Sequence, residues 1–195
     1  MSLETRVSIA EAEQLVKEAF LRNGVTEAVA MSVSTALVAA EAEGQVGHGF
    51  SRVKDYIAQV KSKKINVDAK VKIEHPKPTS ISIDADYGFA YPALDQAISE
   101  GALVAKEYGS AVVSIFNSHH CGALSIQVEK IANRGLIGLM MANTPKAIAP
   151  WGKGAIFWNQ PNSFCSSKKR KRSISYRFIF IQGCPRENNA CKKGK

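Results

Sequence analysis

Three of the four histidines in this chain lie in two short runs that also contain glycine. His48 stands between Gly47 and Gly49, and Arg52 follows four residues later. Histidine titrates near neutral pH, so it can give and take a proton in the cell. The planar guanidinium of arginine matches a carboxylate group. Together these residue types and this spacing indicate a site for a small 2-oxo or 2-hydroxy acid.

The second run, residues 118–123, places His119 and His120 directly before Cys121. Adjacent side chains of an extended segment point in opposite directions, so we expect only one of the two histidines to face a site. The cluster also raises the alternative of a zinc site. However, no Cys-x2-Cys or His-Glu-x-x-His partner accompanies it, so we expect no metal. Cys121 is interpreted as a small buried residue rather than a nucleophile.

Each of these residues also has a purely structural interpretation. His48 fits a surface position at the end of a helix. Arg52 and Tyr56 fall on one face of a following helix, and that face is equally consistent with simple solvation. Spacing alone leaves both alternatives open.

Three helices are predicted in the N-terminal unit, residues 1–66. Ser8 and Glu11 form a capping-box pattern ahead of apolar residues at helical spacing, and Gly24 ends that helix. Thr26 precedes an alanine-rich helix that runs to about Glu43, and a third helix is expected over residues 51–62. The unit places His48 between the second and third helices.

Strands alternate with helices over residues 67–157. Alternation of apolar and polar residues predicts strands at 67–74 and 80–84 with a turn at 75–78. Further strands are expected at 111–116 and 136–142, and helices at 92–108 and 123–133. This order predicts an α/β fold with polar loops at the strand ends, where ligands tend to bind. No GxGxxG follows a strand, so an ordinary Rossmann fold is not expected.

In their order along the chain, five motifs resemble the malate/L-lactate dehydrogenase family of NAD(P)-dependent oxidoreductases, a group distinct from Rossmann-type lactate and malate dehydrogenases. The motifs are His48-Gly49-x-x-Arg52, Tyr87-Gly88-Phe89-Ala90, Ser118-His119-His120-x-Gly122-Ala123, Gly135-Leu136-Ile137-Gly138, and Asn143-Thr144 followed by Ala149-Pro150-Trp151-Gly152. The resemblance covers residues 1–158. It rests on the combination, because each motif alone is weak.

Residues 1–6 lack the apolar stretch of a signal peptide, so the expected location is the cytoplasm. The resemblance implies a homodimeric enzyme that moves a hydride between NAD or NADP and a small 2-oxo or 2-hydroxy acid. It implies a helical N-terminal unit beside a mixed-sheet nucleotide-binding domain. It makes His48 the catalytic proton donor, Arg52 and Tyr56 substrate contacts, and His120 a second catalytic histidine near the nicotinamide. The cofactor-binding residues that it implies are His120, Asn143, Thr144 and Pro145.

Two departures from the family pattern concern the substrate. Gly47 occupies a place where the family often has a serine that touches substrate. The pair His119-His120 resembles the branch of the family that acts on cyclic imino acids. A cyclic imino acid reductase is therefore an alternative to a 2-hydroxy acid dehydrogenase.

Residues 158–195 differ from the rest of the chain in charge and in cysteine content. Beyond residue 158 lie ten of the 26 Lys and Arg residues but one of the 17 acidic residues, while the remainder has no net charge. With suitable codons, removal of one base at Trp158 turns residues 157–165 into Phe-Gly-Thr-Asn-Pro-Ile-Ala-Phe-Ala, in the style of the family. We hypothesise that this tail is a frameshift product and that the fold is incomplete at its C-terminus. The gene sequence would test this hypothesis.

The frameshift hypothesis predicts that the 195-residue chain has no measurable turnover. Two alternatives take the tail as it stands. Its basic run, residues 168–172, could bind nucleic acid, or the chain could be a non-catalytic fragment that pairs with an intact relative. We do not expect nucleic acid as a partner. We also expect no membrane partner, because no apolar run is long enough to span a bilayer.

Overall fold

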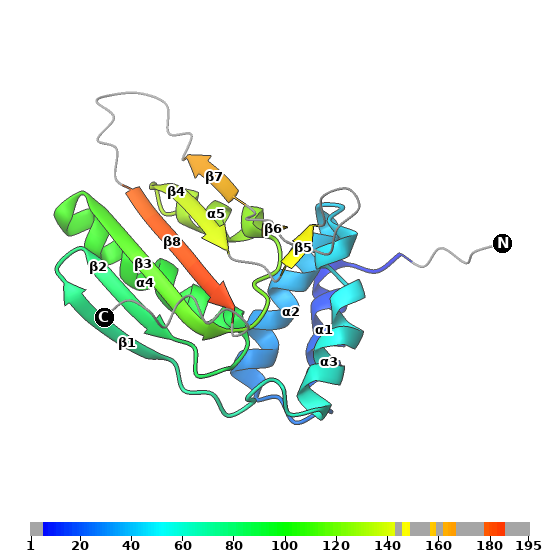
Figure 1. Cartoon of the computed structure of the whole chain (residues 1–195). Helices are drawn as coiled ribbons and strands as arrows, with labels where there is room; N and C mark the ends of the chain where they lie inside the picture. Colours follow the sequence, from blue (N-terminus) through cyan, green and yellow to red (C-terminus); the bar gives the residue numbers. More distant parts are fainter. Residues whose placement is uncertain (1–5, 143–145, 149–156, 159–161, 167–177, 186–195) are drawn as a thin grey trace.

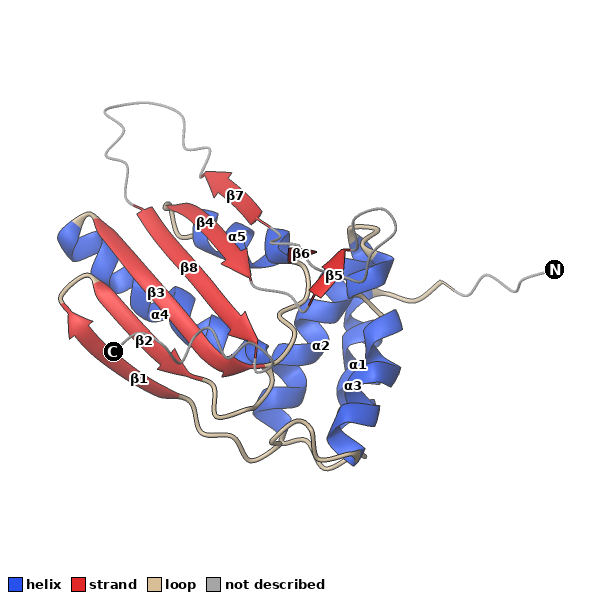
Figure 2. Cartoon of the chain, viewed as in Figure 1, coloured by secondary structure: helices blue, strands red, loops and turns tan. Residues whose placement is uncertain are grey.

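The computed structural model of the chain describes residues 6–142, 146–148, 157–158, 162–166 and 178–185. Within these residues a group of helices stands beside a mixed β-sheet, and two further helices cover one face of that sheet (Figures 1 and 2). The expected α/β class, with a helical N-terminal unit and a mixed sheet, is confirmed.

The helical unit follows the predicted boundaries closely. It consists of α1 (Ile9–Leu21), α2 (Glu27–Ala42), the short 3-10 helix η1 (Val46–His48) and α3 (Ser51–Lys61). The capping box is formed: the Glu11 backbone N–H donates to the Ser8 hydroxyl, and the Ser8 backbone N–H donates to the Glu11 carboxylate. Thr26 precedes α2 without such a side-chain hydrogen bond. The 3-10 helix is the element that carries His48.

The main sheet has the strand order β1-β2-β3-β8-β4-β7. Its strands are β1 (Lys72–Lys77), β2 (Ser80–Asp84), β3 (Ser110–Ser118), β4 (Ile137–Ala142), β7 (Asn162–Ser166) and β8 (Phe178–Pro185). The four inner strands are parallel, and β1 and β7 pair antiparallel at the edges. A separate pair is formed by β5 (Lys146–Ile148) and β6 (Phe157–Trp158).

Helices α4 (Ala90–Tyr108) and α5 (Leu124–Ala132) lie along one face of the sheet (Figure 1). Alternate residues of the strands point into this layer, and Ile83, Val113 and Met140 are fully buried there. The loop that links β3 to α5 contains His120, and β3 ends beside the helical unit (Figure 1). The end of β3 therefore positions the loop with His120 on the side of the molecule where His48 lies.

The predicted turn at residues 75–78 is wrong in position. The strand β1 continues through His75, Pro76 and Lys77, and the turn lies at residues 78–79. The pairing of β1 with β2 is irregular between Glu74 and Lys77. A proline is tolerated there because β1 is an edge strand and needs no N–H donor on its outer side.

Two strands of the main sheet, β7 and β8, come from the segment after residue 158. The strand β8 lies between β3 and β4, and Ile179 and Ile181 are buried in the main core. The division into units 1–66, 67–157 and 158–195 stays a prediction. The main sheet contains strands from before and from after residue 158.

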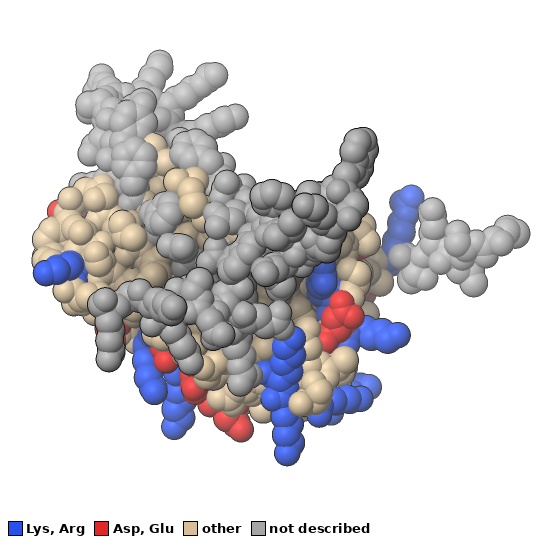
Figure 3. Space-filling model, in the orientation of Figure 1, with Lys and Arg blue, Asp and Glu red and all other residues tan. Residues whose placement is uncertain are grey.

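Acidic and basic side chains are mixed over the described surface that faces the viewer in Figure 3. This mixture matches the balanced charge of the sequence before residue 158. The basic run 168–172 lies outside the described residues. In the described part of the chain, no helix is both long enough and apolar enough to cross a membrane.

Candidate active site

His48 is held on a compact turn between α2 and α3. The turn is tied to α5 by a hydrogen bond from Gln45 Nε2 to Ser125 Oγ at 2.7 Å. The backbone N–H of Phe50 donates to the Glu41 carboxylate at 2.7 Å. Gly49 is required here, because a Cβ at this position would overlap the Glu41 side chain. These contacts give the His48 backbone a defined place at the end of η1.

The rings of His48 and His120 are stacked, although 72 positions separate them in the sequence. Their centroids are 5.5 Å apart and their planes are inclined by 15°. His119 is directed elsewhere, with its Nε2 3.0 Å from the Lys64 carbonyl oxygen after α3. The two neighbouring histidines thus contact different parts of the fold, and His120 is the one that faces His48.

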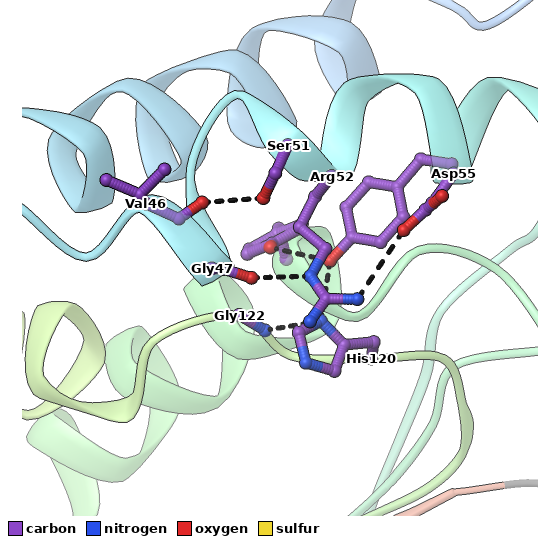
Figure 4. A network of polar contacts seen from close by, with 9 residues as sticks. Val46, Gly47, Ser51, Arg52, Asp55, His120 and Gly122 are labelled. Atoms are coloured by element: carbon purple, nitrogen blue, oxygen red, sulfur yellow. Dashed lines mark hydrogen bonds and ion pairs between the residues drawn. The ribbon is translucent and has the colours of Figure 1, made fainter.

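Arg52 lies in the first turn of α3 and reaches back over the His48 turn (Figure 4). Its Nε donates to the Gly47 carbonyl oxygen at 2.6 Å, and its Nη1 lies 3.6 Å from Asp55 Oδ2. These two contacts orient the guanidinium, and about a third of the side chain remains exposed at 36%. Arg52 therefore presents a positive charge beside the two histidines.

Tyr56 lies buried on the inner side of His120. Its side chain is 2% exposed. Its hydroxyl lies 2.8 Å from His120 Nδ1 and 3.0 Å from the Tyr91 hydroxyl. Tyr56 therefore contacts His120 within the cluster, and its role as a substrate contact stays a prediction.

Tyr91 belongs to the same cluster, and sequence reasoning missed it. It lies at the start of α4, directly after the Tyr87–Ala90 family motif, and is 1% exposed. Neither its spacing nor its type distinguishes it from an ordinary core tyrosine. Its proximity to Tyr56 becomes visible only in the folded chain, where the two hydroxyls meet.

The surroundings lower the pKa of both stacked histidines. The pKa of His120 falls from 6.5 to about 4, first because of burial and then because of the positive charges of Arg52 and His48. The pKa of His48 is lowered by burial and by Arg52. His120 keeps an exposed edge, while Tyr56 encloses its Nδ1 side. Both rings therefore favour the neutral form at pH 7.

The cysteine of the second run behaves as expected for an inert thiol. Cys121 packs partly buried against the main core, and burial raises its thiol pKa to about 11. Across the described residues, no group of three or more His, Cys, Asp or Glu side chains is placed to hold a metal ion.

Of the expected cofactor-binding residues, His120 is in the described structure, whereas Asn143, Thr144 and Pro145 lie outside the described residues. The ring of His120 fits a nicotinamide on electrostatic grounds. Because it is neutral and partly exposed, it does not repel the positively charged ring of an oxidised nicotinamide.

Comparison with known proteins places this site in a family. The sequence profile described as malate/L-lactate dehydrogenase matches residues 7–175. The chain belongs to the malate/L-lactate dehydrogenase family. The matched range contains all five residues of the cluster, His48, Arg52, Tyr56, Tyr91 and His120. It continues past residue 158, where we expected the resemblance to stop.

Individual relatives cover most of this chain. It is 35% identical over 164 residues to a (2R)-3-sulfolactate dehydrogenase (NADP(+)) of Chromohalobacter salexigens, a match that covers 84% of this chain and 49% of that protein. The malate dehydrogenase structure from Pyrococcus horikoshii OT3 has a TM-score of 0.79 at 27% identity, over 86% of this chain and 48% of that one.

A third relative has a different kind of substrate in its name. The structure of Δ1-piperideine-2-carboxylate reductase from Pseudomonas syringae pv. tomato matches with a TM-score of 0.79 at 28% identity, over 84% of this chain and 50% of that one. This chain spans about half the length of the curated relatives that it matches.

Proposed function

We propose that this chain carries the acid-binding and proton-transfer residues of an NAD(P)-dependent oxidoreductase that interconverts small 2-hydroxy and 2-oxo acids. The stacked pair His48 and His120 beside the oriented guanidinium of Arg52 supports this proposal most strongly. Relatives named as sulfolactate and malate dehydrogenases agree with a small, anionic hydroxy acid. A bound nicotinamide supplies the hydride acceptor or donor.

The proposed chemistry assigns one task to each residue. Arg52 binds the carboxylate of the acid through charge-assisted hydrogen bonds. In the oxidation direction, a ring nitrogen of His48 takes the hydroxyl proton as the hydride leaves C2 of the acid. In the reduction direction, the same nitrogen returns the proton to the carbonyl oxygen. The lowered pKa of His48 favours the proton-accepting form, which suits oxidation.

A cyclic imino acid is the second candidate substrate. Two observations favour it: the paired His119-His120, and the similarity to piperideine- and pyrroline-carboxylate reductases. Such a substrate also carries a carboxylate for Arg52, and His48 would then protonate an imine nitrogen. The homodimer implied by the resemblance and the expected cytoplasmic location remain predictions.

Binding of the acid can be tested on the 195-residue chain directly. Pyruvate, oxaloacetate and a cyclic imino acid are titrated while histidine NMR signals are observed. The Arg52→Gln variant should bind the acid about 10- to 100-fold more weakly, because charged hydrogen bonds are lost. Arg22→Gln, at an exposed position after α1, is the matched control and should bind like the wild type.

Hydride transfer is tested in a protein expressed from the gene after removal of one base at the Trp158 codon, the frame-repaired protein. NAD(P)H absorbance is followed with the same acids. Replacement of His48 by Ala should lower the rate about 10²–10⁴-fold. If Arg52→Gln binds the acid as tightly as the wild type, the role of Arg52 is refuted. If His48→Ala turns over at the wild-type rate, the role of His48 is refuted. The acid that is turned over fastest distinguishes the two candidate substrates.

A further inference from the structure

One backbone contact indicates which nitrogen of the neutral His120 ring carries the hydrogen. The N–H of Gly122 points at His120 Nδ1, at an N–N distance of 3.3 Å (Figure 4). A backbone N–H can only donate, so Nδ1 must be an unprotonated acceptor. In the neutral ring the hydrogen therefore resides on Nε2.

This assignment sets the direction of two further hydrogen bonds. The Tyr56 hydroxyl lies 2.8 Å from the same Nδ1, and because Nδ1 carries no hydrogen, Tyr56 must be the donor. The Tyr56 oxygen is then free to accept, and the Tyr91 hydroxyl lies 3.0 Å away. The chain of donation runs from Tyr91 to Tyr56 to His120.

The hydroxyl chain is buried and cannot readily exchange its partners for water. Tyr56 and Tyr91 are 2% and 1% exposed. Burial raises the pKa of both phenols well above the ordinary value, so both remain protonated donors at cell pH. Gly122 permits the close approach of Tyr91, since a Cβ there would lie 2.5 Å from the Tyr91 hydroxyl oxygen.

We propose that Tyr91 and Tyr56 are positioning residues that hold His120 in the Nε2–H tautomer. The ring then offers an N–H donor, which suits a carbonyl or carboxamide oxygen of a bound ligand. This use of the N–H rests on the proposed function. The tautomer itself is a property of the folded chain and can be measured without any ligand.

The test is the nitrogen NMR spectrum of the full chain with ¹⁵N-labelled histidine, recorded at neutral pH. The His120 signals are assigned by their loss in the His120→Asn variant. In the wild type we expect the Nε2–H form to dominate. The ratio of Nε2–H to Nδ1–H should fall about 5- to 10-fold in Tyr56→Phe, because one buried hydrogen bond is lost. A smaller fall, about 2- to 3-fold, is expected in Tyr91→Phe.

The matched control is Tyr108→Phe, which makes the same change at the exposed end of α4 and should leave the ratio unchanged. A wild-type ring that is mainly Nδ1–H would overturn the proposal, even if Tyr56→Phe did not fold. Ratios in Tyr56→Phe and Tyr91→Phe that match the control would overturn it as well. Loss of acid binding with the tautomer intact would count against the proposed function alone.

Discussion

His48 and His120 are of one residue type, yet their proton affinities are determined by what surrounds them. Burial lowers the pKa of each ring, and the charge of Arg52 acts on both in the same direction. Because the rings are stacked, a proton on one disfavours a proton on the other. This coupling between the two rings depends on a tertiary contact that no local sequence pattern encodes.

The lowered pKa of His120 predicts a loss of stability in acid. Its pKa is about 4 in the folded chain and 6.5 ordinarily, so between these values the unfolded chain binds the additional proton. The free energy of unfolding should therefore fall as pH drops from about 6.5 to about 4. Urea unfolding at several pH values over this range measures how the free energy of unfolding changes with pH. Water at the exposed edge of the ring makes this change smaller but does not alter its sign.

Two variants separate this effect from general acid sensitivity. His120→Asn keeps an acceptor at the place of Nδ1 but cannot titrate, so its stability should depend less on pH in this window. His75→Asn, at an exposed position on β1, should keep the wild-type slope. Identical slopes in His120→Asn and the wild type would contradict the prediction.

The loop between β3 and α5 is shaped by its contacts with α3 and α4. Gly122 adopts a φ of +67°, and Tyr91 packs against the place that a side chain would occupy. The glycine therefore serves two purposes at once: a left-handed backbone and room for a tyrosine. Helix packing and loop conformation depend on each other here, and together they place His120.

Substitution of this glycine should cost more than backbone strain alone. Gly135→Ala, at a φ of +79° with open space around it, should lose about 1–2 kcal/mol of unfolding free energy. Gly122→Ala should lose about 1–3 kcal/mol more, because the new Cβ meets the buried Tyr91 ring. Urea denaturation of both variants measures the difference, and equal losses would show that Tyr91 does not press on this loop.

For the whole molecule, the central question is how the segment after residue 158 joins the fold. The strand β8 separates β3 from β4 and supplies Ile179 and Ile181 to the main core. The segment differs in composition from the rest of the chain but occupies an inner position in the sheet. Its origin in a frameshift stays a prediction, and its contribution to stability can be measured separately.

If β8 is part of the sheet in solution, Ile181→Ala should be strongly destabilising. Ile181 is fully buried, and removal of a buried isoleucine side chain costs about 2–5 kcal/mol. Val112→Ala, on the exposed face of β3, should cost less than about 1 kcal/mol. Thermal or urea unfolding compares the two. An Ile181→Ala variant as stable as Val112→Ala would place β8 outside the folded core.

Local sequence patterns were sufficient for much of the fold and for part of the site. The capping box at Ser8, the helix that carries Arg52 and the divergence of His119 from His120 depend on residues a few positions apart. These features depend on local backbone geometry, which can be predicted from residue types and short spacings. The resemblance to the family then implied an active-site role for His48 and another for His120.

Packing between distant segments settled the remainder. The buried hydroxyl chain joins Tyr56 on α3 to Tyr91 on α4, 35 positions away, and β8 enters the sheet between two strands that precede it. The irregular pairing that accommodates Pro76 likewise depends on β1 being an edge strand. Such contacts form only when separate elements bury their apolar faces together, and residue spacing along the chain does not specify which elements will meet.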